Sequence, residues 1–153
     1  MSQRVETATQ VLYKAFNEGT LNAFNCKACA VGNMITQDGF FDEHEYRIWH
    51  MHTICYDYNE IEYEIEYEED LNYLPTHSQF STDELAKIEK RFLEAWQDEE
   101  KLHKDYAHDR TIQFKGLMNV LDYLYHLDGI ETPSEVYNDF LDVLNEEEKL
   151  ELQ

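Results

Sequence analysis

The chain has 153 residues, a length typical of one domain, and 42% of them are hydrophobic, which is too many for a disordered acidic tail. Its 33 Asp and Glu against 12 Lys and Arg give a formal net charge of −21, which disfavours direct binding to nucleic acids and favours basic partners. No stretch approaches the roughly 20 apolar residues of a membrane span, and the polar start of the chain is unlike a signal peptide. We therefore expect one acidic cytoplasmic domain over residues 1–153, without membrane association.

The first predicted element is a helix over residues 4–18, which Gly19 ends. Apolar residues recur at helical spacing on one of its faces: Val5, Ala8, Val11, Leu12, Ala15 and Phe16. Asn25 is a suitable cap for a second, short helix over about 26–35. Cys26 would then lie in the first turn of that helix.

The middle of the chain contains the one segment with a strand pattern. Residues 42–56 are compatible with a helix or with an extended segment, whereas residues 60–68 alternate strictly between apolar and acidic side chains. Such alternation predicts a strand with one apolar face. A lone strand is not stable, so we expect a small two-stranded β element near residues 48–68.

Three further helices are predicted in the second half. Ser81 and Glu84 have the spacing of a capping box and start a helix that we expect to run to about His103, with Leu85, Ile88, Phe92, Ala95 and Trp96 buried. The next helix covers about 110–127, and the last begins at Pro133 and Ser134. We expect residues 145–153 to fray. The predicted fold is mainly α, with four to five packed helices and the small β element.

The chain has three cysteines, an odd and small number that does not suit a disulfide framework. Cys26 and Cys29 are spaced as C-x-x-C, and His50 and His52 follow after twenty intervening residues. Thiolates and neutral imidazoles are ligands that zinc prefers, so these four residues are a candidate zinc or iron site. A thiol redox pair and a purely structural role in the core are the alternatives, and the spacing does not choose among them.

An acidic row is the second candidate site. Glu62, Glu64, Glu66 and Glu68 would project from one face of the predicted strand, about 6.8 Å apart, a spacing comparable to that of phosphates along a nucleic-acid strand. Together with Tyr63 and Tyr67 they could bind a basic protein partner, including one whose groove normally holds nucleic acid. The simpler interpretation is a solvated strand face that its charge protects from aggregation.

No motif of nucleotide binding, zinc proteolysis or serine hydrolysis is present, and only five glycines are available for phosphate-binding loops. The sequence therefore favours a non-catalytic binding or regulatory protein over an enzyme. The two rival hypotheses are a metal or thiol-redox protein that uses Cys26 and Cys29, and a structural subunit of a larger assembly.

The segment Asn25-Cys26-x-x-Cys29-Ala30-Val31-Gly32-Asn33 resembles a motif in a group of small uncharacterised proteins from Bacteroidetes and their phages. Residues 81–92 and 114–130 resemble two helical segments of that group, and only about 40–76 fall outside the resemblance. Some members are labelled as the F subunit of a sodium-pumping NADH–quinone reductase, but this chain has no room for that subunit's flavin and NADH domains. The resemblance implies no known activity. It makes the cysteines, Gly32 and Asn33 the first positions to test.

Overall fold

A computed structural model describes residues 2–23, 29–36 and 80–151. This part of the chain is mainly helical, as predicted. It contains four long helices, α1 (Gln3–Glu18), α5 (Thr82–Asp98), α6 (Arg110–Leu127) and α7 (Ser134–Glu151), with the short helix α2 (Ala30–Thr36) and the 3-10 turn η2 (Lys104–Tyr106). The described ranges contain no strand, and the β element predicted near 48–68 lies outside them. No helix in these ranges is long and apolar enough to cross a membrane.

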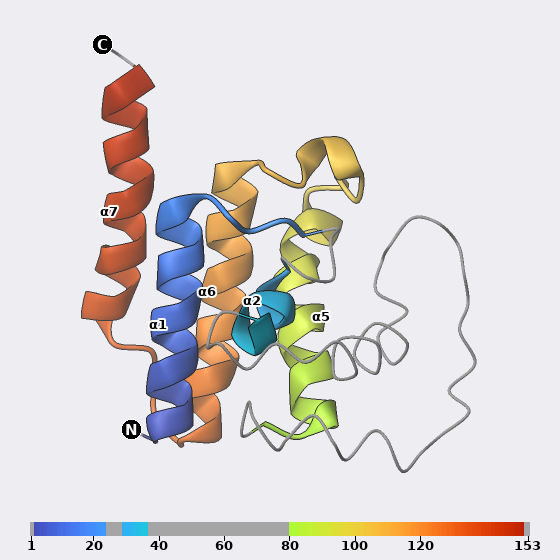
Figure 1. Cartoon of the computed structure of the whole chain (residues 1–153), viewed down its shortest axis with the longest axis vertical. Coiled ribbons are helices and arrows are strands. Elements are labelled where there is room, and N and C mark those ends of the chain that lie inside the picture. Colours follow the sequence, from blue (N-terminus) through green and yellow to red (C-terminus); the bar gives the residue numbers. More distant parts are fainter. Residues whose placement is uncertain (1, 24–28, 37–79, 152–153) are drawn as a thin grey trace.

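The long helices pack side by side, and α2 lies across two of them (Figure 1). Helix α5 packs along α6, and α7 packs on both α1 and α6. Helix α2 contacts α1 on one side and α5 on the other. Helix α2 thereby links α1 and α5.

Helix α1 confirms its prediction in both its end and its buried face. Val5, Ala8, Val11, Leu12, Ala15 and Phe16 are all buried. Gly19 has φ 73°, in the left-handed region that favours glycine, and its backbone N–H donates to the Phe16 carbonyl oxygen (3.2 Å). Local sequence signals therefore determine this helix.

Helix α5 starts as predicted and ends earlier than predicted. The capping box is formed, with the Ser81 hydroxyl accepting from the Glu84 N–H (3.1 Å) and the Glu84 carboxylate accepting from the Ser81 N–H (2.8 Å). The prediction that the helix reaches His103 is wrong, because Glu100 adopts φ 54° and the chain turns back there. The turn lets Trp96 Nε1 donate to the Tyr106 carbonyl oxygen (2.8 Å), so a tertiary contact decides this end.

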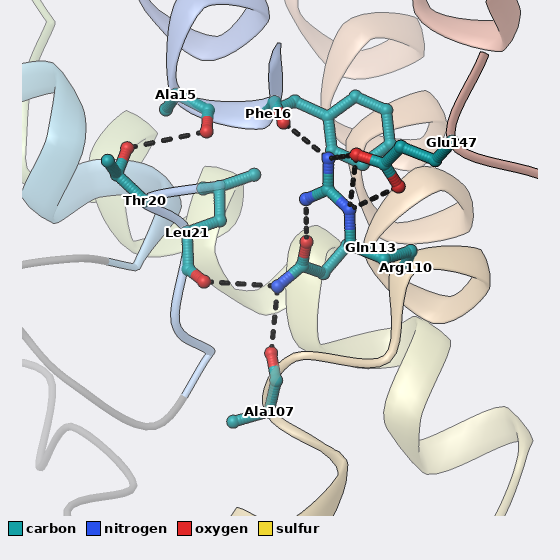
Figure 2. Close-up of polar contacts among 8 residues, drawn as sticks. All are labelled: Ala15, Phe16, Thr20, Leu21, Ala107, Arg110, Gln113 and Glu147. Carbon is teal, nitrogen blue, oxygen red and sulfur yellow. Dashed lines mark hydrogen bonds and ion pairs between the residues drawn. The ribbon is translucent and has the colours of Figure 1, made fainter. Parts of the chain in front are cut away.

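Helix α7 is held by an arginine at the start of α6 (Figure 2). Arg110 Nε donates to Glu147 Oε2 (2.9 Å), its Nη1 donates to Gln113 Oε1 (2.6 Å), and its guanidinium stacks on the Phe16 ring at 4.1 Å. Buried Gln113 in turn donates to the carbonyl oxygens of Leu21 and Ala107. Helix α7 continues to Glu151, past the point at which we expected the tail to fray, and its Glu147 is anchored within that stretch.

Candidate functional site: a buried cysteine–glutamate pair

Glu89 is an acidic residue on the buried face of α5. Leu85, four residues before it, and Phe92, three residues after it, are wholly buried, as is the adjacent Ile88, and Glu89 itself is only 5% exposed. Charged side chains are rarely buried to this degree unless a partner compensates their charge. The contacts of Glu89 therefore have to compensate for the burial of its carboxyl group.

Cys29 lies directly before α2 and has 0% exposure. Its carbonyl oxygen accepts from the Asn33 backbone N–H (2.9 Å) and from the Asn33 side-chain amide (3.0 Å). Asn33 is itself buried, so both bonds are shielded from water. These bonds fix the backbone from which the Cys29 thiol projects.

The two side chains meet between α2 and α5. The Cys29 thiol hydrogen-bonds to the Glu89 carboxyl group, and the Val31 backbone N–H donates to Glu89 Oε2 (3.2 Å). Glu89 Oε1 is buried and accepts no hydrogen bond. Both donors are neutral, and no Lys, Arg or His in the described ranges forms an ion pair with Glu89. The pair is therefore a buried acid with spare acceptor capacity.

Burial raises the pKa of the Glu89 carboxyl to about 7, and the hydrogen bonds from the Cys29 thiol and the Val31 N–H offset only part of this effect. At neutral pH the carboxyl is consequently divided between its protonated and ionised forms. An acid in this range can exchange a proton with its surroundings, or a cation can replace that proton.

Most of the sequence-predicted site residues lie outside the described ranges. These are Cys26, His50 and His52 of the candidate metal site and the whole acidic row, Glu62, Tyr63, Glu64, Glu66, Tyr67 and Glu68. Cys29 is the one predicted ligand that is described. No three His, Cys, Asp or Glu side chains gather in a metal-binding arrangement within residues 2–23, 29–36 and 80–151.

Glu89 was missed at the sequence level, although a signal for it existed. Its position is one residue after Ile88 and three before Phe92, which places it on the apolar face of the helix. An acidic residue at such a position breaks the amphipathic pattern. In a chain with 33 Asp and Glu, that one irregularity was hidden among many exposed carboxylates.

A separate polar pocket of about 360 Å³ lies between α5 and α6. Its lining residues are Arg91, Asn119, Asp122, Tyr123 and His126. Asn119 donates to the Arg91 carbonyl oxygen (3.3 Å), and Asp122 accepts from the Thr132 hydroxyl (2.7 Å). These bonds stabilise the fold locally, and the pocket presents no nucleophile–base pair.

Comparisons with protein-family models, with curated proteins and with solved structures found no match. The resemblance to the Bacteroidetes and phage proteins stays a prediction.

Proposed function

We propose that the chain is a non-catalytic binding protein that presents an acidic surface to a basic protein partner. The acidic row with Glu62, Glu64, Glu66 and Glu68 and the tyrosines Tyr63 and Tyr67 remains the proposed centre of that surface. A partner with a basic groove that also accepts nucleic acid fits this row best, because the carboxylates would then occupy phosphate positions.

The observation that supports this proposal is the charge on α7. The helix carries seven carboxylates and one lysine, and four of the carboxylates form an exposed stripe at three- and four-residue spacing: Glu135, Asp139, Asp142 and Glu146. We call these four residues the α7 stripe. Lys149, the one cation of α7, lies 3.6 Å from Glu146.

This arrangement is unfavourable for the isolated helix. Like charges three or four residues apart repel each other, at roughly 0.2–0.5 kcal/mol per pair. Glu146 near the C-terminus also opposes the helix dipole, whereas Glu135 in the first turn is favourable to it. Local helix stability therefore does not account for the α7 stripe. A basic partner would neutralise it and recover that free energy.

The chain's own cations do not neutralise the surface, since several of them are engaged elsewhere. Arg4 is paired with Glu84 (3.0 Å), Arg110 with Glu147 (2.6 Å) and Lys115 with Glu99. These pairs join different elements of the fold. Lys149 is the one cation that α7 itself supplies near the α7 stripe. The excess negative charge therefore faces solvent, where a partner can reach it.

The test compares three variants that remove the same number of carboxylates. The first replaces Glu62, Glu64, Glu66 and Glu68 with Gln, and the second replaces the α7 stripe with Gln and Asn. The control changes four exposed carboxylates on other elements: Glu6, Glu18, Asp98 and Glu100. Affinity for a fluorescent arginine-rich peptide is measured by anisotropy, after circular dichroism has established that each variant is helical.

We expect the first variant to lose roughly tenfold or more in affinity, the second to lose less, and the control to lose least, because contact charges matter more than distant ones. Equal losses in all three variants would contradict the proposal, since binding would then follow net charge without a defined surface.

A further inference from the structure

We infer that the pocket between α5 and α6 binds a small hydroxylated organic anion, such as a sugar phosphate, with Arg91 and His126 at its anionic group. This inference is independent of the proposed acidic surface. Arg91 belongs to α5 and His126 to α6. The other lining residues, all on α6, are Asn119, Asp122 and Tyr123.

The first argument is the size and the layout of the pocket. Its volume of about 360 Å³ lies at the lower end of the range of ligand-binding pockets and suits a ligand of the size of a phosphorylated sugar. The lining residues of α6 are spaced three and four residues apart, so they share one face of that helix. The Asn119 side-chain amide donates to the Arg91 carbonyl oxygen (3.3 Å), which fixes the two walls to each other.

The second argument is the charge of α5 beside the pocket. Lys87, Lys90 and Arg91 are all exposed, and they are three of the 12 Lys and Arg of the chain. The one acid among residues 87–91 is Glu89, which lies on the buried face of the helix. Arg91 makes only a long ion pair with Glu94 (3.6 Å), and its side chain is 53% exposed. This part of the surface is therefore locally cationic, and it fits an anionic ligand.

The third argument is the supply of hydrogen-bond donors. The Arg91 guanidinium and the His126 imidazole carry N–H groups, and the charged oxygens of a phosphate or carboxylate accept from such groups. Burial and the nearby Glu84 carboxylate raise the pKa of Tyr123, so its hydroxyl stays protonated at neutral pH and is a third donor.

Asp122 is the reason to expect hydroxyl groups on the ligand. Its carboxylate would repel a bare anion, but it accepts from hydroxyl groups, as its Oδ1 does from the Thr132 hydroxyl (2.7 Å). A carboxylate can accept several hydrogen bonds, so Asp122 can also accept from a ligand. The Tyr123 ring offers an apolar surface to the carbon atoms of such a ligand.

The experiment is a titration of the isotope-labelled full chain, followed by heteronuclear NMR at neutral pH and low salt. The ligands are glucose 6-phosphate, inorganic phosphate and glucose, which separate the contribution of the anion from that of the hydroxyl groups. Arg91→Gln and His126→Gln are the test variants, both at exposed positions. Lys14→Gln, at an exposed position on α1, is the control and changes the net charge as much as Arg91→Gln does. The spectrum of each variant also shows whether it is folded.

We expect glucose 6-phosphate to cause saturable shifts of the backbone amides of residues 91 and 119–126, with weaker binding of inorganic phosphate and none of glucose. Each test variant should weaken the affinity for glucose 6-phosphate at least roughly fivefold, because a hydrogen bond between a charged group and the ligand is lost. Lys14→Gln should change the affinity by less than about twofold, because a distant charge is screened.

The inference is overturned if glucose 6-phosphate causes no saturable shifts at millimolar concentration, or if the shifts lie away from the pocket. Equal affinities of the parent chain and of folded Arg91→Gln also overturn it. If inorganic phosphate binds as tightly as glucose 6-phosphate, the pocket holds an adventitious ion only, which contradicts an organic ligand.

Discussion

At the residue scale, Glu89 is the most unusual side chain in the described part of the protein. It occupies a position on α5 that would suit leucine, between the wholly buried Ile88 and Phe92. Replacing a buried, partly satisfied acid with an apolar residue often stabilises a protein. An acid at this position therefore does not serve the stability of the fold at neutral pH, and its carboxyl is available to exchange a proton.

The raised pKa of Glu89 predicts a pH-dependent stability in the metal-free protein. Because the folded-state pKa of about 7 lies above the ordinary value of 4.5, the folded state holds the proton more tightly than the unfolded state does. Stability that is present below pH 4.5 is thus lost progressively as the pH rises toward about 7. The full loss amounts to about 3 kcal/mol.

The matched variant for this prediction is Glu89→Gln, which keeps an oxygen acceptor for the Val31 N–H and cannot ionise. We expect the difference in unfolding free energy between the two metal-free proteins to change by about 3 kcal/mol across this range, in favour of Gln at high pH. Urea denaturation at a series of pH values measures it. Parallel curves for the two proteins would show that Glu89 does not titrate in this range.

At the element scale, α5 and α6 approach each other closely at Gly116. A Cβ atom added there would lie 2.7 Å from the Phe92 carbonyl oxygen and 2.8 Å from its ring, so the helices would have to separate. We expect Gly116→Ala to destabilise the fold by about 1–3 kcal/mol, despite the higher helix propensity of alanine. Thermal unfolding of Gly116→Ala measures the effect, with Thr111→Ala at an exposed position on the same helix as the control. A Gly116→Ala protein as stable as the parent would disprove this close approach.

The second half of α7 depends on Arg110. Replacing Arg110 with Ala removes the bonds to Glu147 and to Gln113 and the stacking on Phe16. We expect a loss of about 2 kcal/mol and faster amide exchange over residues 144–151, with the exchange of α5 little changed. Hydrogen-exchange mass spectrometry reads both helices in one experiment. Uniform protection of α7 in the variant would mean that apolar packing alone holds the helix.

The helices could be predicted from the sequence where local signals decide them, and not where tertiary contacts do. Gly19 and the Ser81 capping box act within one turn, so α1 and the start of α5 were predicted correctly. The end of α5 depends on the Trp96–Tyr106 bond, and the length of α7 coincides with the Arg110–Glu147 pair. Neither contact is visible in a local window of sequence.

The candidate site was only half predicted, for the same reason. The C-x-x-C spacing singled out Cys29 because sequence neighbours define that motif. Glu89 lies sixty residues later, and only the packing of α2 on α5 brings the two together. The buried face of α5 was predicted correctly at Ile88 and Phe92. An acidic residue among these apolar positions was a signal for Glu89 that the prediction did not use.

At the scale of the whole molecule, the net charge of −21 destabilises the folded state through electrostatic repulsion. Added salt screens charges over a Debye length of about 10 Å at 0.1 M. We therefore expect the melting temperature to rise by several degrees between low salt and roughly 0.5 M NaCl, since more repulsive than attractive pairs are screened. Calorimetry at constant pH measures this, and a falling melting temperature would show that the interhelical ion pairs outweigh the repulsion.

The same charge underlies the proposed binding of a basic partner, and a salt series tests that binding most directly. The affinity of the arginine-rich peptide is measured by anisotropy at increasing NaCl concentration, for the parent chain and for the variant with Gln at 62, 64, 66 and 68. We predict a steep linear fall of log affinity with log salt for the parent chain, and a distinctly shallower slope for the variant. An affinity that is insensitive to salt, or slopes that are equal in the two proteins, would contradict a function based on this acidic surface.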